Sequence, residues 1–215
     1  MHQRAEQVEK NVFKVSITKR LNKSIMEKRN YSVIYRLMHW SIAFCMLFIL
    51  FTVFLRMTWM NKDNVADIMQ KYFANTSTSL TREQLIDLAK QIRKPMWVWH
   101  NYAGYVLSAL FFLRLTLPFF GELKFANPFN KQLALKVKFQ YWVYLVFYVC
   151  VLISLVTGLA IEFGPGNMKN TVEEIHVLSI YYLLTFLVLH VGGILIAEFT
   201  VNPGIISRIV RGTKG

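Results

Sequence analysis

Long apolar windows alternate with polar segments along the chain. Four windows contain no Asp, Glu, Lys or Arg, and they cover residues 37–55, 95–113, 139–161 and 175–197. A helix of about 20 residues, rising about 1.5 Å per residue, crosses the hydrocarbon core of a bilayer. A buried core helix in a soluble protein explains one such window but not four. The pattern therefore predicts four transmembrane helices, over about 36–57, 95–118, 139–161 and 175–197.

The segment between the first two spans, residues 58–94, has a helical pattern of its own. Thr81 and Gln84 match the capping box that starts many helices. Apolar side chains then recur at helical spacing, at Leu85, Leu88 and Ile92. This pattern predicts a short amphipathic helix from about 82 to 93, and Pro95 is expected to start the second span. The expected fold is an all-α integral membrane protein, a four-transmembrane-helix bundle with this short helix in its first outer loop.

Composition and charge indicate which way the helices cross. The chain is 54% hydrophobic with a mean hydropathy of +0.35, whereas soluble domains are about 45–50% apolar. With four spans, both termini and the loop after the second span share one side, and that side carries 17 of the 25 Lys and Arg residues. Such an excess marks the cytoplasmic side. Both termini are therefore expected in the cytoplasm, and residues 58–94 outside.

The difference in charge between the two sides remains when acidic residues are included, because the inner side then carries a net charge of +12 and the outer side +1. Basic flanks beside anionic lipid explain this charge, so no nucleic-acid partner is expected. Residues 1–30 form a basic tail without the apolar core of a signal peptide, and the first span is expected to serve as the insertion signal. Residues 31–212 are expected to form one transmembrane domain. Cys45 and Cys150 lie inside predicted spans, where packing is their expected role.

Four of the five histidines lie inside the predicted spans, where an imidazole is unfavourable without a partner. They are His39, His100, His176 and His190. One intramembrane histidine is readily explained as a satisfied core residue. Four of them, with few other polar groups at the same depth, favour a functional site instead.

The spacing of His176 and His190 indicates how these histidines are arranged. Fourteen residues at about 100° each end about 40° short of four full turns, so both side chains are expected on nearly one face, about 21 Å apart along the axis. Depth in the membrane matches His39 with His190 on the inner side. On the outer side it matches His100 with His176. Two facing imidazoles at each of two depths suit two bis-histidine haems b.

Zinc is the main competing ligand for these histidines. Structural zinc usually takes four nitrogen or sulfur ligands around one point, whereas these histidines separate into two pairs and no cysteine joins either pair. Copper meets the same difficulty. Haem brings four equatorial nitrogens, so two axial histidines complete the coordination of its iron. Covalently attached haem is not expected, because the chain has no C-x-x-C-H motif.

Glycines near the histidines fit two different roles. Gly104 follows His100 by one turn, and Gly192 and Gly193 follow His190. A missing side chain leaves room for a flat ring, and it equally permits close contact between helices. The aromatic residues near the span ends most simply form interfacial belts, at Trp40, Trp97, Trp99 and Tyr102.

Two arginines are candidates for contacts with haem propionates. Arg36 lies one turn before His39, and Arg114 lies 14 residues after His100, so both are expected near the inner side. The guanidinium group binds carboxylates through two parallel hydrogen bonds. Ordinary anchoring at the inner membrane face explains both residues equally well.

Several motifs together resemble a known family. They are RLMHW in the first span, H-x-x-x-G-Y with a later R-L in the second (His100, Gly104, Tyr105, Arg114, Leu115), LVTG in the third, and I-H with a second histidine 14 residues on in the fourth. Over about residues 30–212 the chain is similar to the bacterial cytochrome b561 family, which includes the b-type cytochrome subunits of membrane-bound nickel–iron hydrogenases. The resemblance implies a four-helix bundle with two haems b, held by the four histidines in the same pairs. The chain departs from the family in its long outer segment, and in FTVFLR, where many members have Thr-Gly.

The resemblance also implies a function in electron transfer. The chain is expected in the bacterial inner membrane, where it exchanges electrons between quinone or quinol and a redox partner protein on the outer, periplasmic side. A second class stays open, in which the chain alone is a quinol oxidoreductase that acts on oxygen or superoxide, so the sequence leaves open whether the chain is an enzyme. The histidine pairs disfavour a transporter or a haem-free structural protein.

Overall fold

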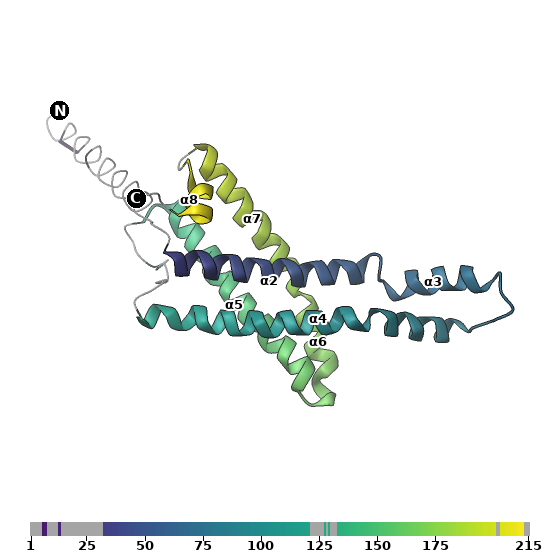
Figure 1. The fold of residues 1–215 in the computed structure, drawn as a ribbon. Coiled ribbons are helices and arrows are strands. Elements are labelled where there is room, and N and C mark those ends of the chain that lie inside the picture. Colours follow the sequence, from purple (N-terminus) through teal and green to yellow (C-terminus); the bar gives the residue numbers. More distant parts are fainter. Residues whose placement is uncertain are drawn as a thin grey trace. The chain divides into compact units, whose positions relative to one another are not determined.

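The computed structural model describes residues 6–7, 13, 32–120, 127, 129, 133–200 and 203–212. Its helices are α2 (Val33–Met57), α3 (Lys62–Phe73), α4 (Arg82–Thr116), η1 (Leu117–Phe120), α5 (Leu135–Phe163), η2 (Gly166–Met168), α6 (Lys169–Val177), α7 (Ser179–Thr200) and α8 (Ile205–Arg211). Figure 1 labels the α-helices. No strand occurs in these described residues. Four helical stretches are long and apolar enough to cross a membrane, and they cover Val33–Met57, Arg82–Phe120, Leu135–Phe163 and Gly166–Thr200. The predicted all-α class with four membrane-crossing helices is thereby confirmed.

Each charge-free window of the sequence lies within one of these four stretches. The match has a physical cause, because hydrocarbon offers no hydrogen bonds and a helix satisfies its own backbone. The predicted basic tail, apart from residues 6, 7 and 13, lies outside the described residues, as does most of the loop at 121–132.

Contacts along the chain group the helices into two compact units. The α2–α4 unit comprises Leu37–Glu122, and the α5–α8 unit comprises Met1–Arg36 with Leu123–Gly215. A single transmembrane domain over residues 31–212 stays a prediction.

In the α2–α4 unit, α3 packs against the first part of α4 as a helical hairpin (Figure 1). Ala66 of α3 and Ala89 of α4 are fully buried, and Leu85 is 1% exposed. Small residues let two helix backbones approach closely, and the leucine fills the remaining space. The hairpin therefore has a small core of its own.

The sequence pattern did not predict α3, because this helix is largely polar and its buried face is narrow. Its start is nevertheless defined, since the Asn61 side chain accepts a hydrogen bond from the Asp63 backbone N–H at 2.9 Å. The Arg82 guanidinium then bridges the hairpin, 2.5 Å from an Asp67 carboxylate oxygen and 3.8 Å from one of Asp63. These groups are exposed, so the ion pairs add little to stability beyond the buried core.

The start of α4 was predicted correctly and its continuation was not. Thr81 caps the helix and forms the expected reciprocal pair of hydrogen bonds with Gln84. However, the helix does not end before Pro95, because α4 runs without a break from Arg82 to Thr116. Proline in a helix removes one backbone hydrogen bond, at a cost of about 3 kcal/mol, but helices in membranes tolerate it. Good helix formers on both sides of Pro95, and packing of α3 along the first turns, favour one continuous helix.

The fourth span differs from the uninterrupted helix that the histidine spacing assumed. A turn at Leu178 separates α6 from α7. Two hydrogen bonds of the i to i−3 type mark it, from Leu178 N–H to the Ile175 carbonyl at 3.2 Å and from Tyr181 N–H to the Leu178 carbonyl at 3.1 Å. A 3₁₀ turn rotates by about 120° per residue rather than about 100°. The rotation between His176 and His190 therefore differs from that of a regular α-helix.

The C-terminal helix α8 is held at its start by a carboxylate. Glu198 near the end of α7 accepts hydrogen bonds from the backbone N–H of Gly204 at 2.8 Å and of Ile206 at 3.1 Å. Gly204 has a φ of 82°, a left-handed conformation that glycine adopts without steric cost. The start of α8 therefore uses both a glycine and a capping carboxylate.

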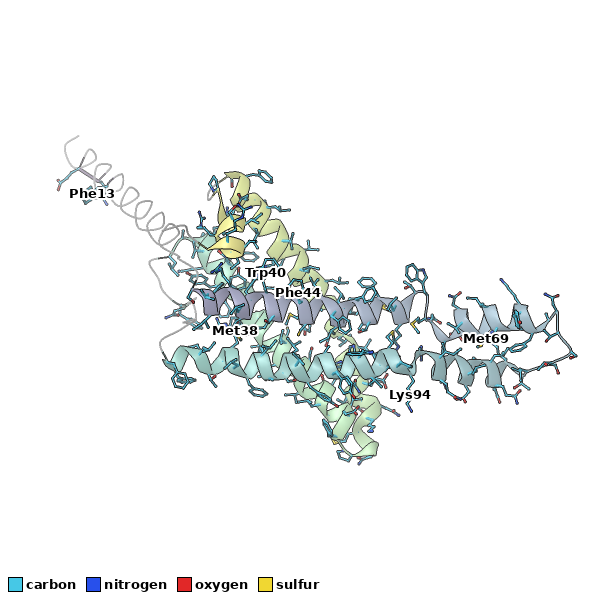
Figure 2. The ribbon with its side chains drawn as sticks, viewed as in Figure 1. Phe13, Met38, Trp40, Phe44, Met69 and Lys94 are labelled. Atoms are coloured by element: carbon cyan, nitrogen blue, oxygen red, sulfur yellow. The ribbon has the colours of Figure 1, made fainter. Side chains whose placement is uncertain are left out.

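Many large apolar side chains remain exposed along the predicted spans. Trp40 and Phe44, labelled in Figure 2, are 37% and 64% exposed and lie one turn apart on α2, whereas Met38 is 7% exposed. Exposed apolar surface on this scale is unusual for a protein in water. Lipid contact explains it, since hydrocarbon solvates these side chains as well as a protein core does.

The hairpin core gives a testable prediction. Replacing Leu85 by Ala should lower the free energy of opening the hairpin by about 2–5 kcal/mol, because the substitution leaves a cavity between α3 and α4. Hydrogen exchange of the α3 amides in detergent measures this free energy. Leu88→Ala is the matched control, since Leu88 lies on the same helix but is 36% exposed. Equal effects of the two substitutions would contradict this packing.

Candidate functional site

The four intramembrane histidines are divided equally between the two units. His39 lies on α2 and His100 on α4, whereas His176 lies on α6 and His190 on α7. All four side chains are half-buried. Each predicted pair takes one histidine from each unit, and the pairing stays a prediction.

His100 is held by a threonine of the neighbouring helix. Its Nδ1 lies 2.8 Å from the hydroxyl oxygen of Thr52, which is 3% exposed on α2. The same hydroxyl donates its proton to the backbone carbonyl of Ile49 at 2.6 Å. Trp97 contacts the imidazole edge-on at 5.0 Å, and the Arg56 guanidinium lies 4.9 Å above the Trp97 ring. The imidazole orientation is therefore fixed from both α2 and α4.

His176 has an equivalent arrangement in the other unit. Its Nδ1 lies 3.1 Å from the Thr157 hydroxyl and 3.1 Å from the Ser154 carbonyl oxygen, both on α5. Thr157 donates its own proton to the backbone carbonyl of Ile153 at 2.8 Å. In each unit, therefore, a threonine donates its hydroxyl proton to a carbonyl of its own helix, and the hydroxyl oxygen lies beside a histidine Nδ1.

Space for the His176 ring depends on Gly158. A Cβ added at Gly158 would lie 3.1 Å from Cε1 of His176, closer than most real contacts. A hydrogen-bonded group of hydroxyls lies beside the same backbone, where Tyr182 donates to Ser154 at 2.8 Å and the Ser154 and Ser179 oxygens are 2.5 Å apart. Ser179 is the first residue of α7, so these bonds fasten the start of that helix to α5.

The other two histidines have aromatic neighbours. His190 stacks on Phe186 with 5.2 Å between ring centroids and 15° between planes, and Phe186 stacks in turn on Phe147 at 3.5 Å. Tyr144 contacts His190 edge-on at 6.2 Å. His39 is in edge contact with Trp40 of the same helix at 5.6 Å. Aromatic contacts of this kind restrict the plane of each imidazole ring.

Glycines on the histidine helices border open space. A Cβ added at Gly104, Gly192 or Gly193 would meet no atom of the described residues within 4 Å. Gly104 lies one turn after His100, and the other two follow His190 directly. Open positions of this kind on the histidine helices are compatible with a flat macrocycle such as haem.

The donor set also fits haem better than a metal ion bound by side chains alone. Within the described parts of the two units, no group of three or more His, Cys, Asp or Glu residues is placed to hold a metal ion. Such an ion needs three or four ligands around one point. Haem supplies its own equatorial nitrogens and requires only axial imidazoles.

The two candidate arginines have different surroundings. Arg36 donates from Nη1 to the Val210 carbonyl of α8 at 3.2 Å, and its guanidinium would lie 3.1 Å from a Cβ added at Gly212. Its Nε is buried and has no hydrogen-bond partner among the described residues. Arg114 lies half-buried in the last turn of α4. A role in binding haem propionates stays a prediction for both.

Thr52 and Thr157 were not recognised from the sequence as histidine partners. A threonine in an apolar window resembles an ordinary β-branched packing residue, because its hydroxyl commonly bonds to its own helix backbone. A weak signal was present, since Thr157 belongs to the family-like LVTG and Thr52 begins TVFLR, where many members have Thr-Gly. Which histidine each threonine meets depends on helix packing, which spacing along the chain does not reveal.

One of three comparisons with known proteins gave a match. A sequence model described as "Prokaryotic cytochrome b561" matches residues 30–212, which is nearly the whole chain and contains all four histidines. The comparisons with curated proteins and with solved structures gave no match. Members of the matched family are membrane-spanning cytochromes that carry electrons on b-type haem. With its four membrane-crossing helices and its intramembrane histidines, the chain belongs to the prokaryotic cytochrome b561 family.

Proposed function

We propose that this chain is a di-haem b-type cytochrome of the bacterial cytoplasmic membrane, which exchanges electrons between quinone or quinol and a redox partner protein on the outer side. One observation supports this proposal most strongly. A half-buried histidine lies in every membrane-crossing helix except α5, with two in the fourth stretch, and each contacts neighbouring side chains. A bound haem supplies an iron that takes up and releases one electron reversibly.

The four histidines are proposed as the axial ligands of two irons. His39 and His190 would hold the inner haem, and depth in the membrane supports their pairing. By the same argument His100 and His176 would hold the outer haem. The turn at Leu178 is compatible with this division, because it lies between His176 and His190 and leaves each on a helix of its own.

Arginines would hold the propionates at the haem edges. The buried Arg36 Nε has no hydrogen-bond partner among the described residues, which supports an anionic group beside it. Arg114 is proposed on its position alone, in the last turn of α4. Anchoring of the helices at the membrane face remains the alternative role for both.

The length of α4 supports docking of a partner. Its 35 residues extend over about 50 Å, whereas about 20 residues cross the hydrocarbon core. The α3–α4 hairpin would then project beyond the membrane on the outer side and present charged and aromatic side chains there. With both termini in the cytoplasm, the inner ends of the helices would lie in the cytoplasmic half of the membrane. Copurification distinguishes this function from a self-contained quinol oxidoreductase, which would turn over quinol without a partner.

Haem content tests the proposal directly. The purified chain should bind about two haems b, because two bis-histidine sites are proposed. A pyridine haemochrome spectrum, together with an iron-to-protein ratio, measures this stoichiometry. A chain purified from haem-replete cells with no bound haem would overturn the proposal.

Single histidine variants test the pairing. His190→Ala should lose about half of the haem, because one iron loses an axial ligand while the other keeps both. His39→Ala should leave the same residual spectrum, and His100→Ala the complementary one. Optical redox titration identifies which haem remains. His2→Ala is the control, since His2 lies in the polar tail, and a shared residual spectrum for His190→Ala and His100→Ala would contradict the pairing.

A further inference from the structure

We propose that Thr52 and Thr157 are positioning residues, which hold His100 and His176 as Nδ1–H tautomers so that Nε2 of each ring keeps the electron pair that binds haem iron. This role rests on the proposed function. Neither threonine is proposed as a haem ligand, and both would act through the histidines.

Proton counting at Thr52 determines the direction of its hydrogen bond with His100. A hydroxyl has one proton, and that of Thr52 is directed to the Ile49 carbonyl at 2.6 Å. The Thr52 oxygen can then only accept from His100 Nδ1, which lies 2.8 Å away. A neutral imidazole with its proton on Nδ1 has a lone pair on Nε2. The buried threonine therefore selects the tautomer that can bind a metal through Nε2.

The same counting applies to His176, with one additional acceptor. The Thr157 proton is directed to the carbonyls of Ile153 at 2.8 Å and Ser154 at 3.1 Å, so its oxygen also accepts from Nδ1. The Ser154 carbonyl oxygen, 3.1 Å from the same Nδ1, can only accept. Both neighbours of His176 Nδ1 therefore require a proton on that nitrogen.

These contacts have a consequence for the redox potential. A ligand imidazole that donates its other N–H to an acceptor becomes more basic, which favours the ferric state and lowers the potential. In the proposed pairing His100 and His176 share the outer haem, so both of its ligands are tuned in this way. His190 instead stacks on Phe186. The threonines would thus lower the redox potential of the outer haem and leave that of the inner haem unchanged.

The test is a redox titration of the purified, haem-loaded chain. Thr52→Val keeps the shape of the side chain and removes the hydroxyl, so it should raise the midpoint potential of one haem and leave the other unchanged. Thr52→Ser restores the acceptor and should restore the potential. Thr58→Val is the matched control, because the Thr58 hydroxyl donates to the Phe54 carbonyl at 2.7 Å in an exposed position.

A second variant keeps the test decisive if Thr52→Val does not fold. Thr157→Val should raise the potential of the same haem by a smaller amount, because the Ser154 carbonyl still accepts from His176. The rise should be largest in the double variant. The ferric low-spin EPR signal of that haem should change in parallel, since it reports the basicity of the axial ligands.

The outcomes separate this inference from the proposed function. Two haems with unchanged potentials in both valine variants would overturn the threonine assignment and leave the cytochrome proposal standing. Equal shifts in Thr52→Ser and Thr52→Val would also overturn it, because the hydroxyl would then be irrelevant. A chain without haem overturns both proposals.

Discussion

An imidazole inside a membrane has two polar nitrogens and no water to satisfy them, and the arrangement of this protein depends on that constraint. In each unit a threonine hydroxyl provides a hydrogen-bond partner for one of the two nitrogens, Nδ1. Its proton bonds to its own helix backbone, so its oxygen is available to accept from a histidine without leaving another polar group unsatisfied. In the proposed ligand assignment, the second nitrogen would bind haem iron. One hydroxyl would then satisfy its own helix backbone and also orient a proposed haem ligand.

Pro95 and the turn at Leu178 are local irregularities in the long helical stretches. Pro95 removes one backbone hydrogen bond from α4, near the point where the hairpin packing of α3 ends. The turn at Leu178 falls directly before Ser179, whose hydroxyl is 2.5 Å from that of Ser154. At that turn the Ser179 hydroxyl has a partner on α5, as a low-dielectric environment favours. Pro95 lies on α4, which carries His100, and the turn at Leu178 follows α6, which carries His176.

The sequence predicted the features that depend on residue type along a single helix. Charge-free windows indicated the four crossings, and the Thr81–Gln84 capping box indicated the start of α4, because both are local signals. The sequence did not predict α3, whose buried face consists largely of Ala66 and becomes recognisable only when Ala89 and Leu85 lie opposite it. The threonine partners were missed for the same reason, since a contact between helices depends on packing. The histidines were selected as candidate ligands because an ionisable side chain in an apolar window is costly unless it binds something.

The proposed pairing of the histidines also implies a contribution of haem to the fold. In the proposed pairing each iron takes one histidine from the α2–α4 unit and one from the α5–α8 unit. A group that binds only when both units are in place stabilises that assembly by mass action. Apolar helices in lipid gain little from hydrophobic burial against each other, so specific contacts matter more than in water. The threonines then have a further role, because a ring held in the correct tautomer before haem arrives loses less entropy when it binds.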